Sequence, residues 1–327
     1  MQVAVPWAEP GSRFTALFEA LVIDWLQEAS LTAVSRQLGL SWDEVDGIQA
    51  RAVTRGLARR KLEPPRRIGV DETSFQKHHE YVTVVSDLDR GVVLHVADDH
   101  YDGSLDQYYE SVGPEGVSRL EVVCMDMWRS YVFATLRHVP DAGRKIAFDK
   151  YHVARLLTIA LDRIRSREHR ELRANGDGRL TRTKYWWLTN PENMDAALAR
   201  QFAPLKHSAL RTARAWAIKE LAMSLWNYTS RTWAERAWNR WLRWALRCQL
   251  PPMRKVAETV RKYLWGILNA IMHRATNALA EGMNSKIQTV KRRACGYRNR
   301  QRFRNAIYFH LGGLDLYPER LRTHTKA

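Results

Sequence analysis

Three aspartates each stand at the end of a short apolar run that has the composition of a buried strand. These are Asp71 after 67–70 (RIGV), Asp126 after 120–125 (LEVVCM) and Asp149 after 144–148 (RKIAF). A carboxylate beside a core strand loses hydration, which costs free energy unless a partner compensates for it. Mg²⁺ prefers carboxylate, water and phosphate oxygens. We therefore interpret Asp71 and Asp126 as a metal-binding pair; the alternative is that each aspartate caps the helix that follows it.

The surrounding pattern predicts a sheet that could position these acids. Strand-like runs occupy five ranges, which are 67–71, 80–87, 91–98, 120–126 and 144–149. Helical patterns near 103–112 and 128–138 precede the fourth and fifth runs. This order predicts an α/β fold with a mixed five-stranded sheet and flanking helices. Neighbouring strands lie about 4.8 Å apart, so Asp71 and Asp126 can reach one cation if their strands are adjacent. Glu72 would point to the opposite face.

Residues 1–62 are expected to form an N-terminal helix-turn-helix domain. Apolar residues recur at helical spacing from Phe14 to Trp25, and Gly39 marks a turn. Ser41 and Glu44 have the spacing of a capping box, which predicts the start of the next helix. The extended Pro64-Pro65 segment that follows predicts a domain boundary.

The helix that begins after Ser41 carries a basic stripe. Arg51, Arg55 and Arg59 lie four residues apart on one helical face, an arrangement suited to DNA phosphates. The first turn also contains acids, which would repel DNA if they faced it. We favour a DNA-binding helix, and the alternative is a plain helical bundle with a solvated basic face.

The net charge indicates a polyanionic partner. The chain has 327 residues, with 52 Lys and Arg against 35 Asp and Glu, which gives a net charge of +17. No apolar segment is long enough to span a bilayer, so nucleic acid is a better interpretation than a membrane surface. Its three cysteines, Cys124, Cys248 and Cys295, have no paired zinc spacing and are typical of reduced thiols in a cytoplasmic protein.

The region from 153 to 275 reads as helix throughout and is rich in Trp and Arg. Trp and Arg together can bind nucleic acid by stacking. Trp238, Trp241 and Trp244 are spaced three apart and line roughly one helical face, so we favour core packing for most of these rings.

Four segments together resemble a known family. They are GVDETSF (69–75), CMDMWRSY (124–131), FDKYHVARL (148–156) and NALAEGMNSKIQTVKRRACGYRN (277–299). In this order they are similar to bacterial insertion-sequence transposases of the ISL-three family, which have an Asp-Asp-Glu catalytic core. The resemblance runs from about residue 11 to about residue 317.

This resemblance implies a ribonuclease-H-like fold with the catalytic triad Asp71, Asp126 and Glu281. It divides the chain into a helix-turn-helix domain (1–62), a first part of the catalytic core (63–152), an all-α insertion (153–270) and a last part of the core (271–327). Asp149 and His152 match an Asp-x-x-His element, and we expect them to be structural residues near the site.

The residues around Glu281 agree with this assignment. Asn277, Glu281, Asn284 and Gln288 fall on one helical face, which predicts a polar stripe directed toward an active site. The basic run that follows is expected to hold DNA beside the metals. Its proposed contacts, in addition to the Arg51 stripe, are Lys286, Lys291, Arg292, Arg293 and Arg298.

The mechanism implied by the resemblance is phosphoryl transfer by two Mg²⁺ or Mn²⁺ ions about 3.5–4 Å apart. The implied partner is double-stranded DNA at the terminal inverted repeats of the element, bound by a homodimer in the bacterial cytoplasm, in association with the nucleoid. Two alternatives stay open: a catalytically decayed repressor that occupies the ends, and another ribonuclease-H-like nuclease.

One departure from the family pattern concerns the N-terminus. Members of the family usually begin with a zinc ribbon of paired cysteines, whereas this sequence starts at MQVAVPWAEPGSRFT, where that module would already have ended. We therefore expect the chain to lack the zinc ribbon, as a shortened copy, a split reading frame or a fragment would.

Overall fold

The computed structural model describes residues 7–9, 12–61, 63–76, 80–98, 102–274 and 278–319; the side chains of residues 102 and 278–281 lie outside this description. The chain divides into two compact units. The first contains Met1–Val123, Arg129–Pro140 and Ala278–Ala327, and the second contains Cys124–Trp128 and Asp141–Asn277. Residues 1–62 therefore do not form a unit of their own, in contrast to the boundary expected at Pro64-Pro65.

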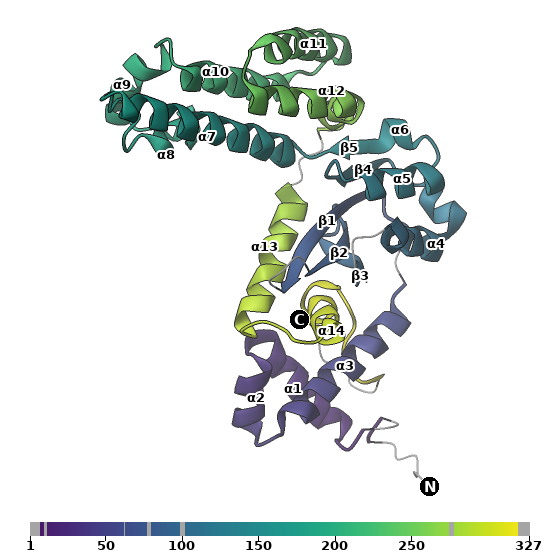
Figure 1. Cartoon of the computed structure of the whole chain (residues 1–327). Coiled ribbons are helices and arrows are strands. Elements are labelled where there is room, and N and C mark those ends of the chain that lie inside the picture. The colour runs from purple at the N-terminus through teal and green to yellow at the C-terminus, as the bar shows by residue number, and fades with distance from the viewer. Residues whose placement is uncertain are drawn as a thin grey trace. The chain divides into compact units, whose positions relative to one another are not determined.

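The five strands form one sheet in the order β3-β2-β1-β4-β5 (Figure 1). They span β1 Arg67–Gln76, β2 Glu80–Asp87, β3 Val92–Ala97, β4 Val122–Met125 and β5 Ile146–Phe148. The pairs β1–β2 and β2–β3 are antiparallel, with Asp71 opposite Val84. Asp126 and Asp149 directly follow β4 and β5.

The first strand is longer than expected, so Asp71 lies in its middle and not at its end. Pairing with β2 continues from Asp71 to Gln76, which lies opposite Glu80. Thr73 and Phe75 alternate inward and are buried, so the second half of the strand also contributes to the core. The apolar run stops at Val70, but the alternation of buried and partly buried side chains that is typical of a strand continues beyond it.

The helices of the first unit are α1 Ala16–Glu28, α2 Leu31–Leu38, α3 Trp42–Arg59, α4 Asp102–Ser118, α5 Arg129–His138, α13 Ala278–Arg293 and α14 Arg300–Leu311. Among them, α4, α13 and α14 contact the strands β1–β3. Helix α13 packs along β1, and α14 packs against both α3 and β3 (Figure 1).

Helices α2 and α3 form the expected helix-turn-helix. Gly39 ends α2 with a φ of 66°, in the left-handed region that glycine adopts without steric cost. The Ser41 side chain accepts a hydrogen bond from the Glu44 amide, and the Glu44 carboxylate accepts one from the Ser41 amide. The predicted capping box is therefore confirmed.

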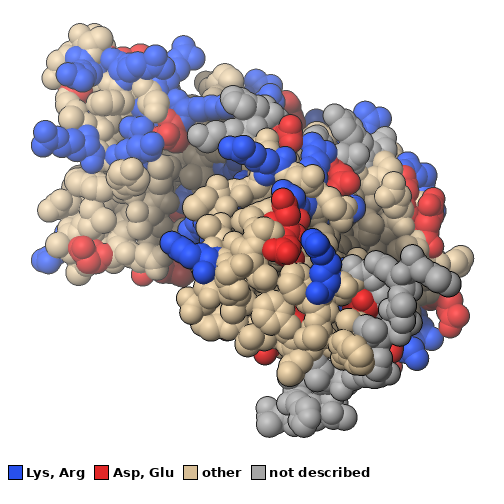
Figure 2. Space-filling model, turned by 90° about the horizontal axis from the view of Figure 1, so that it is seen from below, with Lys and Arg blue, Asp and Glu red and all other residues tan. Residues whose placement is uncertain are grey.

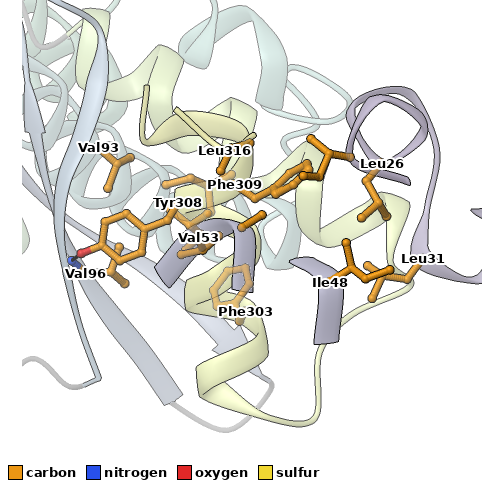
Figure 3. Close-up of a cluster of buried hydrophobic side chains, with 14 of the residues drawn as sticks. Leu26, Leu31, Ile48, Val53, Val93, Val96, Phe303, Tyr308, Phe309 and Leu316 are labelled. Atoms are coloured by element: carbon orange, nitrogen blue, oxygen red, sulfur yellow. Dashed lines mark hydrogen bonds between the residues drawn. The ribbon is translucent and has the colours of Figure 1, made fainter. Parts of the chain in front are cut away.

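The helix-turn-helix and the sheet share one hydrophobic core. Figure 3 shows side chains of α3, α14 and β3 in a single buried cluster, among them Ile48, Val53, Val93 and Phe303. The hydroxyl of Tyr308 on α14 accepts a hydrogen bond from the Val96 amide on β3 at 3.0 Å. Helix α14 comes from the end of the chain. Because it packs on both the helix-turn-helix and the sheet, the boundary expected from local composition at Pro64-Pro65 does not separate two hydrophobic cores.

A glycine on α3 permits this close packing. A Cβ atom at Gly56 would lie 2.7 Å from the Cβ of Leu314, in the segment that follows α14. Any side chain at this position would push α3 away from the C-terminal segment.

The second unit is mainly helical. Its longer helices are α7 Lys150–Ala174, α9 Ala196–Lys206, α10 Arg211–Ser224, α11 Arg231–Arg247 and α12 Pro251–Met272. Its short helices are α6 Ala142–Lys145, α8 Lys184–Leu188, η1 Pro191–Asn193 and η2 Leu225–Asn227. Trp238 and Trp241 of α11 are fully buried, whereas the Trp244 side chain is exposed.

Polar anchors join the helices of this unit. The buried Glu168 carboxylate on α7 accepts hydrogen bonds from the amides of Arg211 and Thr212, and so satisfies the start of α10. Buried Asn269 on α12 donates to the carbonyl oxygens of Gly143 and Ile146.

Candidate active site

Asp71 is held between its own strand and α13. Its Oδ2 atom accepts a hydrogen bond from the Asn284 side-chain amide at 2.5 Å, and Oδ1 accepts one from the Glu72 backbone amide at 2.8 Å. One helical turn further on, the Gln288 amide donates to the Thr73 hydroxyl at 2.8 Å. The face of α13 that carries Asn284 and Gln288 is therefore directed toward β1.

Glu281 belongs to α13, but its side chain lies outside the described residues, as does the whole of Asn277. Residues three apart in a helix lie on one face, so the backbone of Glu281 shares the face of Asn284. The polar stripe predicted from the sequence thus has two described members, both hydrogen-bonded to β1.

Asn284 orients Asp71, the predicted metal ligand, so its substitution should lower the rate of the DNA cleavage that the family resemblance implies. In Asn284→Ala, the Asp71 carboxylate loses the hydrogen bond that orients it. Groups that orient a metal ligand typically contribute about 10–100-fold to activity or metal affinity, and we expect a loss of that size in a DNA-nicking assay. Asn284→Asp should not restore the rate, because a second carboxylate cannot donate the hydrogen bond. A wild-type rate in Asn284→Ala would contradict this role.

Glu72 points to the other face of β1, as predicted. The hydroxyl of Tyr131 on α5 donates to the Glu72 carboxylate at 3.3 Å, and the same hydroxyl lies 2.7 Å from the Thr83 hydroxyl on β2. Tyr131 is buried. Sequence reasoning missed this partner, since Tyr131 shows no polar pattern of its own.

Asp126, Asp149 and His152 come together in the second unit. The Asp149 amide donates to the Met125 carbonyl oxygen at 3.0 Å, so the ends of β4 and β5 are joined just before the two acids. The Trp128 amide donates to Asp126 at 2.9 Å. Asp149 is buried and caps α7 by accepting from the Tyr151 amide, while the His152 Nε2 atom lies 3.8 Å from its Oδ2.

The electrostatics of this group disfavour its negative charge. Burial raises the pKa of the Asp126 carboxyl, and the Asp149 carboxylate raises it further; the His152 side chain and the Trp128 amide act in the opposite direction. A carboxylate whose charge is disfavoured in this way is suited to a bound cation, which would compensate for it.

Removal of this charge should stabilise the metal-free protein. Asp126→Asn keeps an oxygen that can accept from the Trp128 amide but has no charge. The pKa of Asp126 is higher in the folded than in the unfolded protein. The wild type is therefore most stable, with respect to this group, below the unfolded-state pKa of about 3.9, and it loses stability as the pH rises through the folded-state pKa and Asp126 becomes charged. We therefore expect a higher thermal midpoint for the variant at pH 7.5, by roughly 2–4 °C per kcal/mol gained, and a smaller difference in acid.

Thermal melts over a pH series, with and without Mg²⁺, would measure this effect. Mg²⁺ should raise the midpoint of the wild type and leave that of Asp126→Asn nearly unchanged. A lower midpoint for the variant at pH 7.5 would contradict the prediction.

The carboxylates fit the oxygen-ligand preference of Mg²⁺ or Mn²⁺. Asp71 belongs to the first unit and Asp126 to the second. Among the side chains that the structure describes, no three His, Cys, Asp or Glu are arranged so that they could hold a metal ion. The side chain of Glu281 is outside that set.

The arginine stripe of α3 differs from the expectation. Arg51 donates to the fully buried Glu19 on α1 at 2.5 Å, Arg55 pairs with Glu9 and donates to the Leu316 carbonyl oxygen, and Arg59 donates to the Tyr317 carbonyl oxygen. Their side chains are 30%, 7% and 16% exposed. This row ties α3 to α1 and to the C-terminal segment, so it does not present free cations to DNA. The spacing of these arginines predicts their common helical face, but the side toward which that face points depends on contacts distant in sequence.

Loss of Glu19 should therefore destabilise the fold. Among the described residues, Glu19→Ala leaves the 7%-exposed Arg55 with Glu9 as its acidic partner, and it removes the acidic partner of Arg51. Breaking a buried ion pair on one side typically costs about 3–5 kcal/mol, which urea denaturation would measure. Glu28→Ala, at the exposed end of the same helix, is the matched control and should change stability by less than about 0.5 kcal/mol. Equal stability of the two variants would rule out this network as a major stabilising element.

The basic run after Glu281 contains exposed cations and one that is engaged with β1. Lys286, Arg292 and Arg298 are exposed, as the prediction of DNA contacts requires. Lys291, in contrast, donates to the Ser74 carbonyl oxygen at 2.7 Å, and burial lowers the pKa of its ammonium group. It holds α13 on β1. Lys and Arg cover more of the face drawn in Figure 2 than Asp and Glu do.

Arg302 of α14 neutralises the acids at the start of α3. It pairs with Asp46 at 3.0 Å and with Asp43 at 3.1 Å, and its guanidinium lies 4.4 Å from the centre of the Trp42 ring. The repulsion of DNA expected from these acids is thereby reduced. The position of Arg302 in the basic run was the only sequence signal for this role.

In the described part of the chain, no helix has the length and apolar character needed to cross a bilayer.

A mixed sheet with acids on its strands, helical flanks and a helix-turn-helix are the features that the resemblance to transposases, enzymes that cleave and join DNA, predicted. A family model described as "Transposase", that of the ISL3 family with a DDE core, matches residues 68–307. A second model, "Helix-turn-helix domain of transposase family ISL3", matches residues 3–53. The chain belongs to the ISL3 family of transposases, with a ribonuclease-H-like catalytic domain.

Two curated relatives agree with this assignment. The transposase for insertion sequence element IS1001 of Bordetella parapertussis is 28% identical, over 85% of this chain and 69% of the relative. The transposase for insertion sequence element IS1557 of Mycobacterium tuberculosis is 30% identical, over 91% of this chain and 72% of the relative. The family implies that divalent metal is used and that DNA is bound.

Proposed function

We propose that this transposase cuts DNA at the terminal inverted repeats of an insertion sequence and joins the freed 3′ ends to target DNA. In this proposal Asp71, Asp126 and Glu281 are the catalytic acids and hold two Mg²⁺ or Mn²⁺ ions. The observation that carries it is the hydrogen bond from Asn284 to Asp71, which fastens the helix of the third acid to the strand of the first.

The spacing along α13 and β1 supports Glu281 as the third acid. Four helical residues, from Asn284 to Gln288, advance about 6 Å, and two strand residues, from Asp71 to Thr73, advance about 6.7 Å. The two elements therefore advance by nearly the same distance between these two hydrogen bonds. One turn earlier on the same helical face is Glu281, and two residues earlier on the same strand face is Gly69, which has no side chain to fill the space.

The order of the strands supports Asp126 as the second acid. Strand β4 is next to β1 in the sheet, and Asp126 directly follows β4. Its raised pKa agrees with a carboxylate that a cation would compensate. Asp149 caps α7 and pairs with His152, so these two residues orient the segment next to Asp126 and are not themselves proposed as ligands.

The chain contributes positioning and charge to the reaction. Bound divalent ions would activate the attacking oxygen and stabilise the leaving oxygen of the phosphodiester. Asn284 keeps the Asp71 carboxylate in one orientation. Lys286, Arg292 and Arg298 are exposed on and after α13 and would neutralise phosphates of the duplex. We propose that two copies of the chain act on paired ends as a homodimer.

A nicking assay would test this function. The substrate is a labelled duplex that carries the terminal inverted repeat of the element, and the matched control has the same composition in scrambled order. We expect strand cleavage at the repeat boundary that requires Mg²⁺ or Mn²⁺ and stops in EDTA. Binding of the repeat without cleavage would indicate a decayed repressor, and equal cleavage of both duplexes would indicate another ribonuclease-H-like nuclease.

A further inference from the structure

A cavity of about 600 Å³ opens within the first unit, between α2 and the turn that joins α13 to α14. Residues 30–33 and Arg36 of α2 line one side, residues 293–299 line the other, and Trp42 and Arg302 complete it. Cavities of this size are typical of sites that hold small ligands. Parts of the chain that are about 260 residues apart thus form one site.

Four arginines and no acidic residue line this cavity, and they are Arg36, Arg293, Arg298 and Arg302. Arg302 is paired with Asp43 and Asp46, and Arg293 donates to the Gln27 carbonyl oxygen at 3.3 Å. Within the part of the chain that the structure describes, Arg36 and Arg298 form no hydrogen bond or ion pair, and both are exposed. Two guanidinium groups are therefore available to a ligand.

The walls between these arginines are largely apolar. Leu31 is buried, and Trp42 and Tyr297 are partly buried beside it. The guanidinium fork matches the geometry of phosphate oxygens and binds them in pairs. The apolar surfaces fit the sugar that adjoins a phosphate. The N-terminal turn of α2 also lines the cavity, and the positive end of the helix dipole adds to its preference for anions.

We propose that this cavity, the arginine pocket, binds a phosphate of the DNA backbone together with its sugar. This inference rests on the proposed function, since it assumes that the chain binds end DNA. Arg36 and Arg298 hold the phosphate, and Trp42 and Tyr297 contact the sugar. The pocket joins the helix-turn-helix to the far end of α13, so it would fix DNA at a point between the recognition helices and the helix of Glu281.

A unique thiol offers a direct test. Cys295 lines the pocket and is exposed, whereas Cys124 and Cys248 are buried. Iodoacetamide, which is uncharged, should therefore label Cys295 first. Saturating end-repeat duplex should slow this labelling at least about tenfold by covering the pocket. Inorganic phosphate alone, at a concentration that leaves the ionic strength unchanged, should slow it little.

Paired variants would test the arginines. Arg36→Gln with Arg298→Gln should weaken binding of the duplex about tenfold and reduce the slope of log affinity against log salt by about 0.9 for each phosphate that the variant no longer neutralises. Arg119→Gln is the control, because it removes the charge of an exposed arginine of the same unit outside the pocket. It should leave both quantities nearly unchanged.

The outcomes separate this proposal from the function on which it rests. If the wild type binds the duplex but Cys295 stays fully reactive and the double variant binds normally, the pocket does not hold DNA and the proposed function still stands. If inorganic phosphate protects Cys295 and DNA does not, the pocket takes a small anion and the proposal is wrong. If the wild type binds no repeat DNA at all, the proposed function itself fails.

Discussion

Asp71→Asn is expected to abolish metal-dependent cleavage of end DNA while leaving affinity for that DNA within about twofold. Replacing the carboxylate with an amide removes one charged metal ligand and leaves the shape of β1 unchanged. We expect a loss of at least about 10³-fold in the nicking rate, which corresponds to about 4 kcal/mol of transition-state stabilisation. Single-turnover nicking and filter binding on the same duplex would separate the two effects.

The neighbouring acid provides a matched control for Asp71. Glu72 is on the same strand but faces Tyr131 on the opposite side of the sheet. Glu72→Gln keeps an acceptor for the Tyr131 hydroxyl, so its cleavage rate should stay within a few-fold of the wild type. Cleavage by Asp71→Asn at the wild-type rate would remove Asp71 from the metal site.

Glu281→Gln should have an effect of the same size, because it removes the third proposed ligand. Its nicking rate should fall at least about 10³-fold, and Mg²⁺ should stabilise the variant less than the wild type in thermal melts. The helical fold of α13 should persist, since Gln is also a good helix former. Circular dichroism would verify this.

The other late glutamates serve as controls for Glu281. Glu235 and Glu258 are exposed acids of α11 and α12 in the second unit. Glu235→Gln and Glu258→Gln should nick DNA at near wild-type rates. If one of them instead loses all activity while Glu281→Gln retains it, the third acid has been assigned to the wrong helix.

Local signals in the sequence predicted the elements well. The Ser41–Glu44 capping box and the turn at Gly39 depend on residues within one helical turn, and both are present in the structure. The polar face of α13 was also predictable, because helical periodicity alone places Asn284 and Gln288 together. The length of the strand that contains Asp71 was underestimated, since the second half of this strand is amphipathic and not continuously apolar.

The direction in which a face points was not predictable in the same way. Apolar periodicity from Phe14 to Trp25 predicts a helix, but Leu17 and Leu21 on it are exposed and Glu19 is fully buried. Glu19 is buried because Arg51 and Arg55 reach it from α3, an interaction that no local pattern encodes. The same interaction engages Arg51 and Arg55 of the stripe within the protein. Long-range ion pairs thus decided the role of residues whose spacing was correctly read.

The packing of α14 between α3 and β3 has a consequence for how binding specificity can change. A DNA-reading module with its own core could be exchanged between relatives as a cassette, leaving the nuclease intact. Here a chimera that replaced α1–α3 alone would expose Phe303 and Tyr308 and would leave Leu314 opposite a foreign residue at position 56. Recognition of new end sequences would therefore have to arise by point substitution on the surface of α2 and α3, or by transfer of these helices together with α14.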